Sequence, residues 1–508
     1  MKRGLIAGLF FSVAFAALAL TATSQPPPGG DKKGGAGKGP GGGGAEKGGP
    51  PRYEIGQIFP PFVKDGLELT KEQQKQIDEL EKDLKAKLNK ILTADQKKKI
   101  GEIRPPMPGG PPGGGGPGGG PPGGDGTGQT DTTSKANFGS GKENPAPATP
   151  VGLKAIGGRW FVKEGKPNEY FFRDGQKFVD VFSKQIGDSN KDGIADLSLS
   201  HDEKFLIMKS QNLPNHPTAK YPNSDNPNTI RVQDMTFKLP LEPKPSDTIT
   251  QVPMGAIGVA INGVVFFNPF EMGGMNAVAG YSEVWFDSCC GHPQQTGVYH
   301  YHKYPSCLKT PFPDDGDAHS PVIGFAWDGY PVYGPYDDAK VMAKDLKGDK
   351  ALDVCNGHFD ADRGYHYHAT PEKFPYMLGG YAGVVETSNN RGLGRAGAGA
   401  IKDTQSGESR EGAAFVSVKP GNAERGKRHT VRIELKAGSV PSSVPSRVVI
   451  GPFEGDKLVR TGDVITCEIT IPKDANRGAL LDGHIEFAGG RTGITTVKKN
   501  NIFRVGGE

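Results

Sequence analysis

The sequence lacks most of the short motifs that identify common enzyme families. It contains no Gly-x-Ser-x-Gly elbow, no phosphate-binding Walker loop, no dinucleotide fingerprint and no His-Glu-x-x-His pair. Its 61 basic and 57 acidic residues give a net charge of +4, which is too balanced for an electrostatic nucleic-acid binder. We therefore expect no nucleic-acid partner, and the chemistry must lie outside these enzyme families.

Long apolar runs are also missing, except at the N-terminus. Lys2 and Arg3 precede an apolar run at 5–20, and small residues follow it up to Ser24. This arrangement predicts a signal peptide at 1–24. No later run approaches the 18 apolar residues or so of a membrane span. We therefore expect a secreted or periplasmic protein with no stable membrane span after cleavage.

Glycine and proline, in contrast, are abundant, with 76 and 43 residues. The tracts 25–51 and 105–150 are of low complexity and cannot bury enough apolar surface to offset the entropy of ordering, so they are predicted to be disordered linkers. A glycine-rich connector is predicted at 384–412. These tracts delimit a helical arm at 52–104, a main domain at 151–383 and a small domain at 413–508.

The helical arm contains two predicted capping boxes, Thr70 with Gln73 and Thr93 with Gln96. One apolar stripe follows at three- and four-residue steps, made of Ile77, Leu80, Leu84, Leu88 and Ile91. Residues 69–96 resemble the periplasmic LTxxQ-motif family. A helix this small cannot hide its stripe alone. The helical arm at 69–103 therefore either contacts a protein partner or a second copy through this stripe, or packs as a hairpin on the main body.

Both larger segments favour a mainly β fold. Few stretches between 212 and 383 show a helical period, so the main domain is expected to be rich in β-strands with long loops. In the small domain, alternating apolar segments separated by Gly and Pro turns are typical of a β-sandwich. Cys467 shares an apolar strand face there and is predicted to be a buried thiol.

Histidine is scarce, and its distribution is uneven. Six of the 11 histidines fall in a motif that occurs twice, with every matched position 66 residues apart. Each copy consists of Asp-x-Cys-x-Gly-His, six further residues and Tyr-His-Tyr-His, and the copies begin at Asp287 and Asp353. Eight matched positions in one register indicate a duplication.

The Tyr-His-Tyr-His segments predict strands with both tyrosines on one face and both histidines on the other. Residues i and i+2 on a strand lie about 7 Å apart, so two imidazoles can converge on one ion at about 2.0–2.1 Å. Histidine and carboxylate without thiolate favour an ion such as Zn(II) or Cu(II). The candidate metal ligands are His292, His300, His302, His358, His366, His368, Asp287 and Asp353.

Two interpretations of these histidines are open. They could hold the Lewis-acidic or redox metal of an enzyme with an unknown substrate. They could instead be core residues of a non-enzymatic binding or structural module. The duplication favours metal. Because duplicated strands often face each other across a pseudo-twofold axis, we predict one composite centre containing His300, His302, His366 and His368.

The sequence around the two copies resembles the YHYH-domain family, which is named for this tetrapeptide. The resemblance extends over about 212–383, and besides both copies it includes Leu213–Pro217, Asn226–Asn228, Met254–Gly263, Phe267–Pro269 and Gly324–Pro335. It implies membership of this family and no particular reaction.

The resemblance also implies how the cysteines pair. Four of the five cysteines lie near the two copies, and an oxidising compartment favours disulfides. The family-like bond is Cys289–Cys307. This chain lacks the family's later cysteine near Gly380, so Cys355 is left for the extra Cys290, in a bond that would tie the two copies together.

One further motif suggests a cation site. Asp188, Asn190, Asp192 and Asp196 place oxygen ligands at alternating positions around a glycine, as calcium loops do. The twelfth position is Leu199, where an EF-hand requires a bidentate Glu. The segment is therefore either a short calcium-stabilised turn or a turn held by its own Asx side chains.

Overall fold

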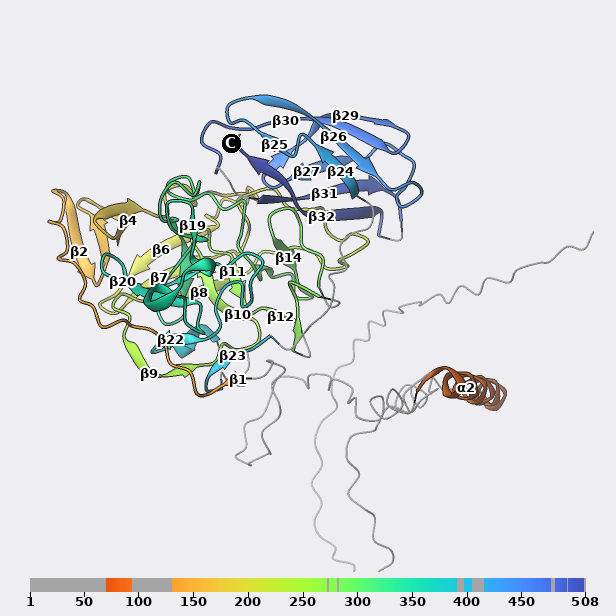
Figure 1. The fold of residues 1–508 in the computed structure, drawn as a ribbon, viewed down its shortest axis with the longest axis horizontal. Coiled ribbons are helices and arrows are strands. Elements are labelled where there is room, and N and C mark those ends of the chain that lie inside the picture. Colours follow the sequence, from red (N-terminus) through yellow and green to blue (C-terminus); the bar gives the residue numbers. More distant parts are fainter. Residues whose placement is uncertain are drawn as a thin grey trace, which may run out of the picture. The chain divides into compact units, whose positions relative to one another are not determined.

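Strands are the main regular structure of the computed structural model and far outnumber helices, so the predicted mainly β fold is confirmed (Figure 1). The structure describes residues 70–93, 130–271, 274–280, 283–390, 397–403, 415–476, 480–490 and 492–506. The predicted signal peptide and first linker lie outside these residues. No helix in these ranges is long and apolar enough to cross a membrane.

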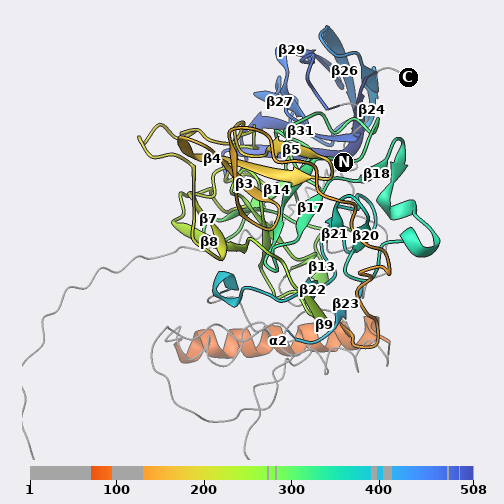
Figure 2. The same ribbon diagram turned by 90° about the vertical axis from the view of Figure 1, so that its left-hand side faces the viewer.

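Helix α2 (Lys71–Ile91) forms where the first capping box predicts it (Figure 2). The Thr70 N–H donates to Gln73 Oε1 at 3.0 Å, and the Gln73 N–H donates to Thr70 Oγ1 at 3.3 Å. The second box lies outside the described residues because it requires Gln96. No residue of α2 is buried, and Leu80 and Ile91 of the apolar stripe are 60% and 74% exposed.

An eight-stranded sheet in the order β14-β15-β11-β10-β16-β17-β21-β20 forms the centre of the main domain. Each strand of the first half has its counterpart 66 positions later in the second half. The pairs are β10 (Ala256–Ala260) with β16 (Val322–Ala326), β11 (Val265–Phe267) with β17 (Pro331–Tyr333), β14 (Gly291–Pro293) with β20 (Gly357–Asp360), and β15 (Tyr299–Tyr301) with β21 (Gly364–His368). The duplication therefore starts well before the repeated motif.

The two halves meet antiparallel at β10 and β16, with Val259 opposite Phe325. These two residues are themselves 66 positions apart, so the register is symmetric about them and a pseudo-twofold axis passes between the strands. In each half a tight turn joins the first two strands, at Asn262-Gly263 and at Asp328-Gly329. Both glycines have a positive φ, +83° and +86°. Residues with a β-carbon rarely adopt this conformation.

Further strands cover the central sheet. As a result, its inner strands are buried on both faces. Trp160 lies 5.0 Å from Phe325 between ring centroids, and Phe237 stacks on Trp327 at 5.1 Å. One covering sheet contains β2 (Leu153–Gly157), β3 (Trp160–Lys163), β4 (Lys166–Asp174) and β5 (Lys177–Asp180), and another contains β6 (Leu197–His201), β7 (Phe205–Ser210) and β8 (Met235–Pro240).

Two-stranded sheets and three 3-10 turns complete the main domain. The pairs are β1 (Thr130–Asp131) with β23 (Ala400–Ile401), β9 (Pro245–Thr250) with β22 (Tyr381–Gly383), β12 (Phe270–Glu271) with β13 (Met275–Asn276), and β18 (Tyr336–Asp338) with β19 (Val341–Met342). The turns are η1 (Ala343–Asp345), η2 (Gly348–Lys350) and η3 (Thr387–Asn390).

Residues 130–150, which composition assigned to a linker, instead lie on the main domain. Phe138 contacts Tyr365 with 4.6 Å between ring centroids, and the Asn137 N–H donates to Asp353 at 2.7 Å. One aromatic ring and a few polar contacts hold this segment on the domain. The many glycines and prolines around them dominate the composition of residues 105–150, so composition alone does not reveal these contacts. The rest of the predicted linker, 105–129, lies outside the described residues.

The small domain is a β-sandwich, as its alternating segments predict. One sheet contains β24 (Phe415–Lys419), β26 (Arg428–Leu435), β30 (Val464–Thr470) and β29 (Asp456–Thr461); the other contains β25 (Asn422–Ala423), β32 (Ile494–Val505), β31 (Leu480–Ala488), β27 (Arg447–Ile450) and β28 (Phe453–Glu454) (Figure 1). Cys467 is a free thiol buried in its core. The sandwich contacts the main domain through polar anchors that include Lys303–Asp482, at 2.9 Å.

Candidate metal centres

Three histidines of the first copy converge beside one carboxylate, and we call this group the first cluster. Strands β14 and β15 pair His292 with His300, and His302 follows on the same face. The Nε2 atoms of His300 and His302 are 3.0 Å apart. Glu271 Oε1 lies 3.6 Å from Nε2 of His302 and 3.8 Å from Nε2 of His292.

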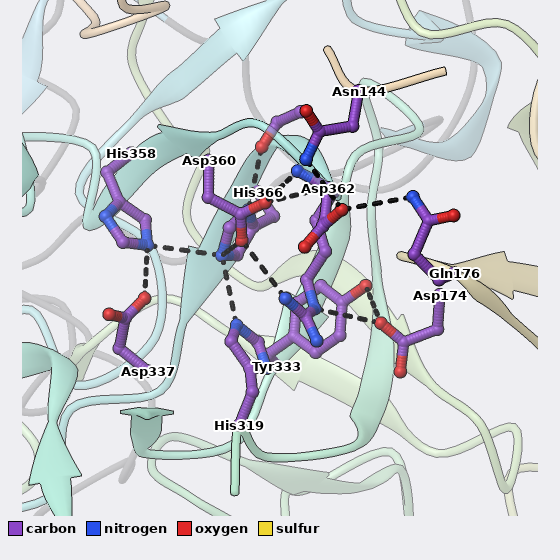
Figure 3. A network of polar contacts seen from close by, with 12 residues as sticks. Asn144, Asp174, Gln176, His319, Tyr333, Asp337, His358, Asp360, Asp362 and His366 are labelled. Carbon is purple, nitrogen blue, oxygen red and sulfur yellow. Dashed lines mark hydrogen bonds and ion pairs between the residues drawn. The ribbon is translucent and has the colours of Figure 1, made fainter. Parts of the chain in front are cut away.

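The second copy builds an equivalent group with one more histidine, which we call the second cluster (Figure 3). His366 Nε2 lies 3.2 Å from the Nε2 atoms of both His358 and His368, and 3.4 Å from that of His319. Asp337 Oδ1 approaches Nε2 of His358 to 3.2 Å. Glu271 and Asp337 are 66 positions apart, so each half supplies its carboxylate from the same place.

Backbone carbonyls determine which ring nitrogen carries the hydrogen. The Nδ1 atoms lie within hydrogen-bond distance of carbonyl oxygens: His300 of Val298 at 3.1 Å, His302 of Asn268 at 2.5 Å, His319 of Ser320 at 2.9 Å, His358 of Lys350 at 2.9 Å, His366 of Gly364 at 2.9 Å and His368 of Gly334 at 2.7 Å. A carbonyl only accepts, so Nδ1 is the donor and a neutral ring presents a lone pair at Nε2.

The Nε2 lone pairs therefore face one another without a hydrogen between them. Such pairs repel at 3.0–3.4 Å, whereas a shared cation would attract both. Two nitrogens bound at about 2.0–2.1 Å to one ion are separated by about 2.9–3.3 Å for angles from about 90° to tetrahedral. The observed spacing is that of ligands around a metal ion. In addition, Nε2 of His292 is buried without any hydrogen-bond partner.

Protonation of these rings does not offset the repulsion between their lone pairs at neutral pH. Burial lowers the pKa of His302 to about 4 and that of His368 to about 3. Burial, followed by the neighbouring imidazoles, lowers the pKa of His292, His300, His319 and His366 well below the usual value.

Two predicted ligands, Asp287 and Asp353, do not reach the histidines. Asp287 accepts hydrogen bonds from the Cys289 N–H at 2.9 Å and from the Tyr299 hydroxyl at 2.9 Å. Asp353 likewise accepts from the Cys355 N–H at 2.8 Å and from the Tyr365 hydroxyl at 2.9 Å. Their assignment as metal ligands is wrong because they bind the tyrosine face of the strand, opposite the histidines.

The predicted composite centre is also wrong. Four strands, β11, β10, β16 and β17, separate β15 from β21, and the converging ligand atoms form separate groups. The pseudo-twofold axis exists, but it passes between β10 and β16. It therefore places the two copies of the motif at opposite edges of the sheet.

Sequence reasoning missed three functional candidates, Glu271, Asp337 and His319. Extending the 66-residue comparison upstream would have found the first two, because Glu271 follows Phe267-Asn268-Pro269 as Asp337 follows Tyr333-Gly334-Pro335. His319 has no counterpart, since the equivalent position is Pro253. Its approach to His366 and His368 depends on the loop before β16, and no local pattern indicates it.

The cysteines agree with the resemblance in one bond and differ in the other. Cys289 and Cys307 form a disulfide, whereas Cys290 and Cys355 are free, so the predicted bond between these two is wrong. Cys290 Sγ faces Ser306 and Asp482, each at 3.7 Å, and Cys355 belongs to the other half. A β-carbon at Gly380 would lie 3.4 Å from Cys355 Sγ, which places the family's absent cysteine beside it.

The predicted calcium loop holds itself with Asx hydrogen bonds. Asp188 accepts from the N–H groups of Asp192 and Gly193 at 3.1 and 2.9 Å, and Asp192 accepts from the Ile194 N–H at 2.8 Å. Asp196 is 2% exposed, and its Oδ1 has no hydrogen-bond partner. These contacts describe a turn, and calcium binding stays a prediction.

The fold and its paired histidine clusters define a β-rich domain built by duplication. Residues 236–350 match the family model described as YHYH protein, so the resemblance to this family is confirmed over that part of the chain. The match includes the first copy of the motif and ends before the second. The LTxxQ resemblance of residues 69–96 stays a prediction.

Other comparisons add no functional information. No curated protein matches the chain. One solved structure, the surface layer protein SbsC, domains 1-6, is 10% identical with a TM-score of 0.12, and the alignment covers 70% of this chain. The chain spans about half of that structure, 54%, and at this TM-score the likeness supports no conclusion about fold.

Proposed function

We propose that this protein is a secreted or periplasmic metal-binding protein that holds one divalent ion at each of its two clusters. The observation that carries this proposal is the convergence of Nε2 lone pairs at 3.0–3.4 Å in both halves. The Nδ1 hydrogen bonds to backbone carbonyls are the usual second contacts of metal-binding imidazoles, since they orient the ring and set its tautomer.

Zn(II) and Cu(II) are the ions that these donors suit best. Each cluster offers imidazole nitrogens and a carboxylate oxygen, which are borderline ligands without a soft thiolate. The third group of converging atoms, His216 with Cys289 and Cys307, is no equivalent, because the two sulfurs are bonded to each other. The Cys289–Cys307 disulfide supports an oxidising compartment.

Elemental analysis of the purified mature chain tests the proposal. We expect about two ions per wild-type chain, about one in His302→Ala and in His368→Ala, and almost none in the double variant. His429→Ala is the matched control, because His429 lies in the sandwich and donates to Glu424 O. A chain from metal-replete medium that holds no metal, and binds neither Cu(II) nor Zn(II) at micromolar concentration, would make the histidines core residues instead.

A further inference from the structure

The two clusters differ in how many protein donors surround the centre. In the second cluster, ligand atoms of His319, Asp337, His366 and His368 all lie within 4.8 Å of one another. In the first cluster the corresponding group contains only His292, His300 and His302. The carboxylates lie at similar distances in both clusters, with Glu271 at 3.6–3.8 Å from the ring nitrogens of His302 and His292 and Asp337 at 3.9 Å from that of His368, so the added imidazole of His319 is what distinguishes the second cluster. The protein can therefore complete a four-coordinate site in the second half, whereas the first half presents three close donors.

The first cluster also lies at the wall of a surface pocket of about 600 Å³. All three of its histidines and Glu271 line this pocket, together with the aromatic side chains of Phe267, Phe270 and Trp285. Three protein ligands with an accessible fourth position are typical of metal sites that act on a ligand, and four protein ligands are typical of structural sites.

We propose that the ion of the first cluster keeps a coordination position for a ligand from solution, and that this ligand is an uncharged polar molecule with an oxygen or nitrogen donor. The second cluster has a structural role. This inference rests on the proposed function, since it requires an ion at the first cluster.

The lining of the pocket indicates the charge of the ligand. Its acidic side chains are Asp225 and Glu271, and none of the lining side chains that the structure describes is a lysine or an arginine. Glu271 beside the histidines and Asp225 at the pocket wall, where it accepts from Ser224 and Thr496, make the lining acidic, so an anion gains little there. The other polar lining groups are neutral, with four amides among them: Asn226, Asn228, Gln294 and Gln295. Amides beside aromatic side chains suit uncharged hydroxyl or amide groups, which they can both donate to and accept from.

Cobalt(II)-loaded mature protein tests this assignment, with imidazole as a neutral probe and azide as an anionic probe. His368→Ala isolates the first cluster, and His302→Ala isolates the second. After elemental analysis of each variant, we expect imidazole to change the visible spectrum of His368→Ala saturably and to leave that of His302→Ala unchanged. Azide should bind His368→Ala more weakly than imidazole does.

The outcomes separate the two proposals. Cobalt in both variants with no response in His368→Ala, or a response only in His302→Ala, overturns this inference and leaves metal binding intact. Absence of cobalt from wild type removes both proposals together. If either variant fails to fold, Gln295→Lys and Gln295→Glu replace them, because Gln295 is exposed at the pocket. Lysine should strengthen azide binding several-fold over glutamate, and equal affinities would overturn the pocket as the route to the ion.

Discussion

At the scale of single residues, a backbone carbonyl sets the tautomer of six of the seven cluster imidazoles. The Asn268 carbonyl holds Nδ1 of His302, and the Gly334 carbonyl holds Nδ1 of His368, 66 positions later. Each ring is thereby fixed with Nε2 toward its cluster. The carbonyls serve as ligand-orienting groups without any side chain, so a conventional motif search does not include them.

Metal retention should persist below the pH range of ordinary histidine. Protons compete with metal only when they bind the free ligand, and burial lowers the pKa of His302 to about 4 and of His368 to about 3. We expect dialysis at about pH 5.5 to leave the bound metal in place, and dialysis near pH 3 to remove it. Loss of metal already at about pH 6 would contradict these lowered pKa values.

The metal-free protein should lose stability over the same range. Unfolded histidine binds a proton near pH 6.5, while the buried rings bind theirs only near the lower folded pKa values. The unfolded state therefore holds more protons between these values, and the free energy of unfolding falls as pH falls through this window. Urea denaturation of the apoprotein at about pH 7, 5.5 and 4 measures this slope.

Substituting asparagine for Asp337 and for Asp353 should change different properties of the protein. Asp337→Asn removes a charge beside His358, so we expect weaker metal binding at the second cluster with little change in the stability of the apoprotein. Asp353→Asn disturbs the acceptor of the Cys355 N–H and the Tyr365 hydroxyl, and should lower the free energy of unfolding by about 1–3 kcal/mol. Metal titration and urea denaturation of both variants check the assignment, and metal loss specific to Asp353→Asn would reverse it.

At the scale of elements, one four-strand unit used twice accounts for both clusters. In each half the hairpin of the first two strands is followed by a carboxylate, at Glu271 or Asp337, and the third and fourth strands supply the histidines. The halves differ where the second adds His319 and the first opens into a pocket. Duplication thus gave both halves the same histidine and carboxylate scaffold, while the surroundings of the two clusters diverged.

The site beside Cys355 should accept a new disulfide. A β-carbon at Gly380 would lie 3.4 Å from Cys355 Sγ, close to the span of a disulfide, and 2.6 Å from Ile249 Cγ2. We expect Gly380→Cys, combined with Ile249→Ala to remove the crowding Cγ2 atom, to pair with Cys355, and the bond to stabilise this variant by about 3 kcal/mol over its reduced form. Non-reducing peptide mapping and the melting temperature test this. Gly380→Ala is the control for crowding, and an introduced thiol that stays free after oxidation would refute the pairing.

The loop at 188–196 should respond to calcium if its unpartnered oxygen is a ligand. Asp196 Oδ1 is the buried atom without a hydrogen-bond partner, and Ca²⁺ prefers such carboxylate oxygens. We expect millimolar calcium to raise the melting temperature by a few degrees in wild type and not in Asp196→Asn. An unchanged melting temperature and unchanged protease sensitivity of residues 151–210 would leave only an Asx turn.

At the scale of the whole molecule, the sandwich is anchored to the half that carries the first cluster. The Ser288 hydroxyl donates to Gly451 O at 2.9 Å, and Lys303 pairs with Asp482 at 2.9 Å. Both main-domain residues lie in or beside the first copy of the motif. Phe286 contacts His302 with 5.7 Å between ring centroids, while Lys303 and Lys498 lie over the Phe286 ring. The sandwich thus supports the wall behind the first cluster.

Limited proteolysis should distinguish the linkers from the segment attached to the main domain. The Gly- and Pro-rich composition predicts early cleavage within 25–51 and 105–129. Residues 130–150 should resist, because Phe138 packs on Tyr365 and Asn144 N–H donates to Ala361 O at 2.6 Å. Phe138→Ala should expose this segment to cleavage. Early cuts within 130–150 of the wild type would show that its composition was the better guide.

The helical arm stays a predicted contact surface for a protein partner or a second copy. Leu80, Leu84 and Ile91 of α2 are exposed, so its apolar stripe has no cover among the residues of its own unit that the structure describes.

The sequence by itself determined whatever depends on local pattern. Alternation predicted the strands and the sandwich, the Thr70 and Gln73 pair predicted the start of α2, and the 66-residue repeat predicted six of the histidines that form the clusters. These features depend on neighbours a few positions apart, or on an identity repeated along the chain. Both kinds of signal are present in one sequence.

Only the tertiary structure decided which groups meet. It shows that Glu271 and Asp337, and not Asp287 and Asp353, are the carboxylates beside the histidines. It also adds His319 to the second cluster and shows two separate clusters where one centre was expected. The reason is physical: Asp287 and Asp353 are near the histidines in sequence but on the opposite strand face, while Glu271 and Asp337 are brought in by strand pairing. Sheet order, set by packing of the whole core, determined that β10 and β16 lie at the axis and that the two histidine clusters lie apart.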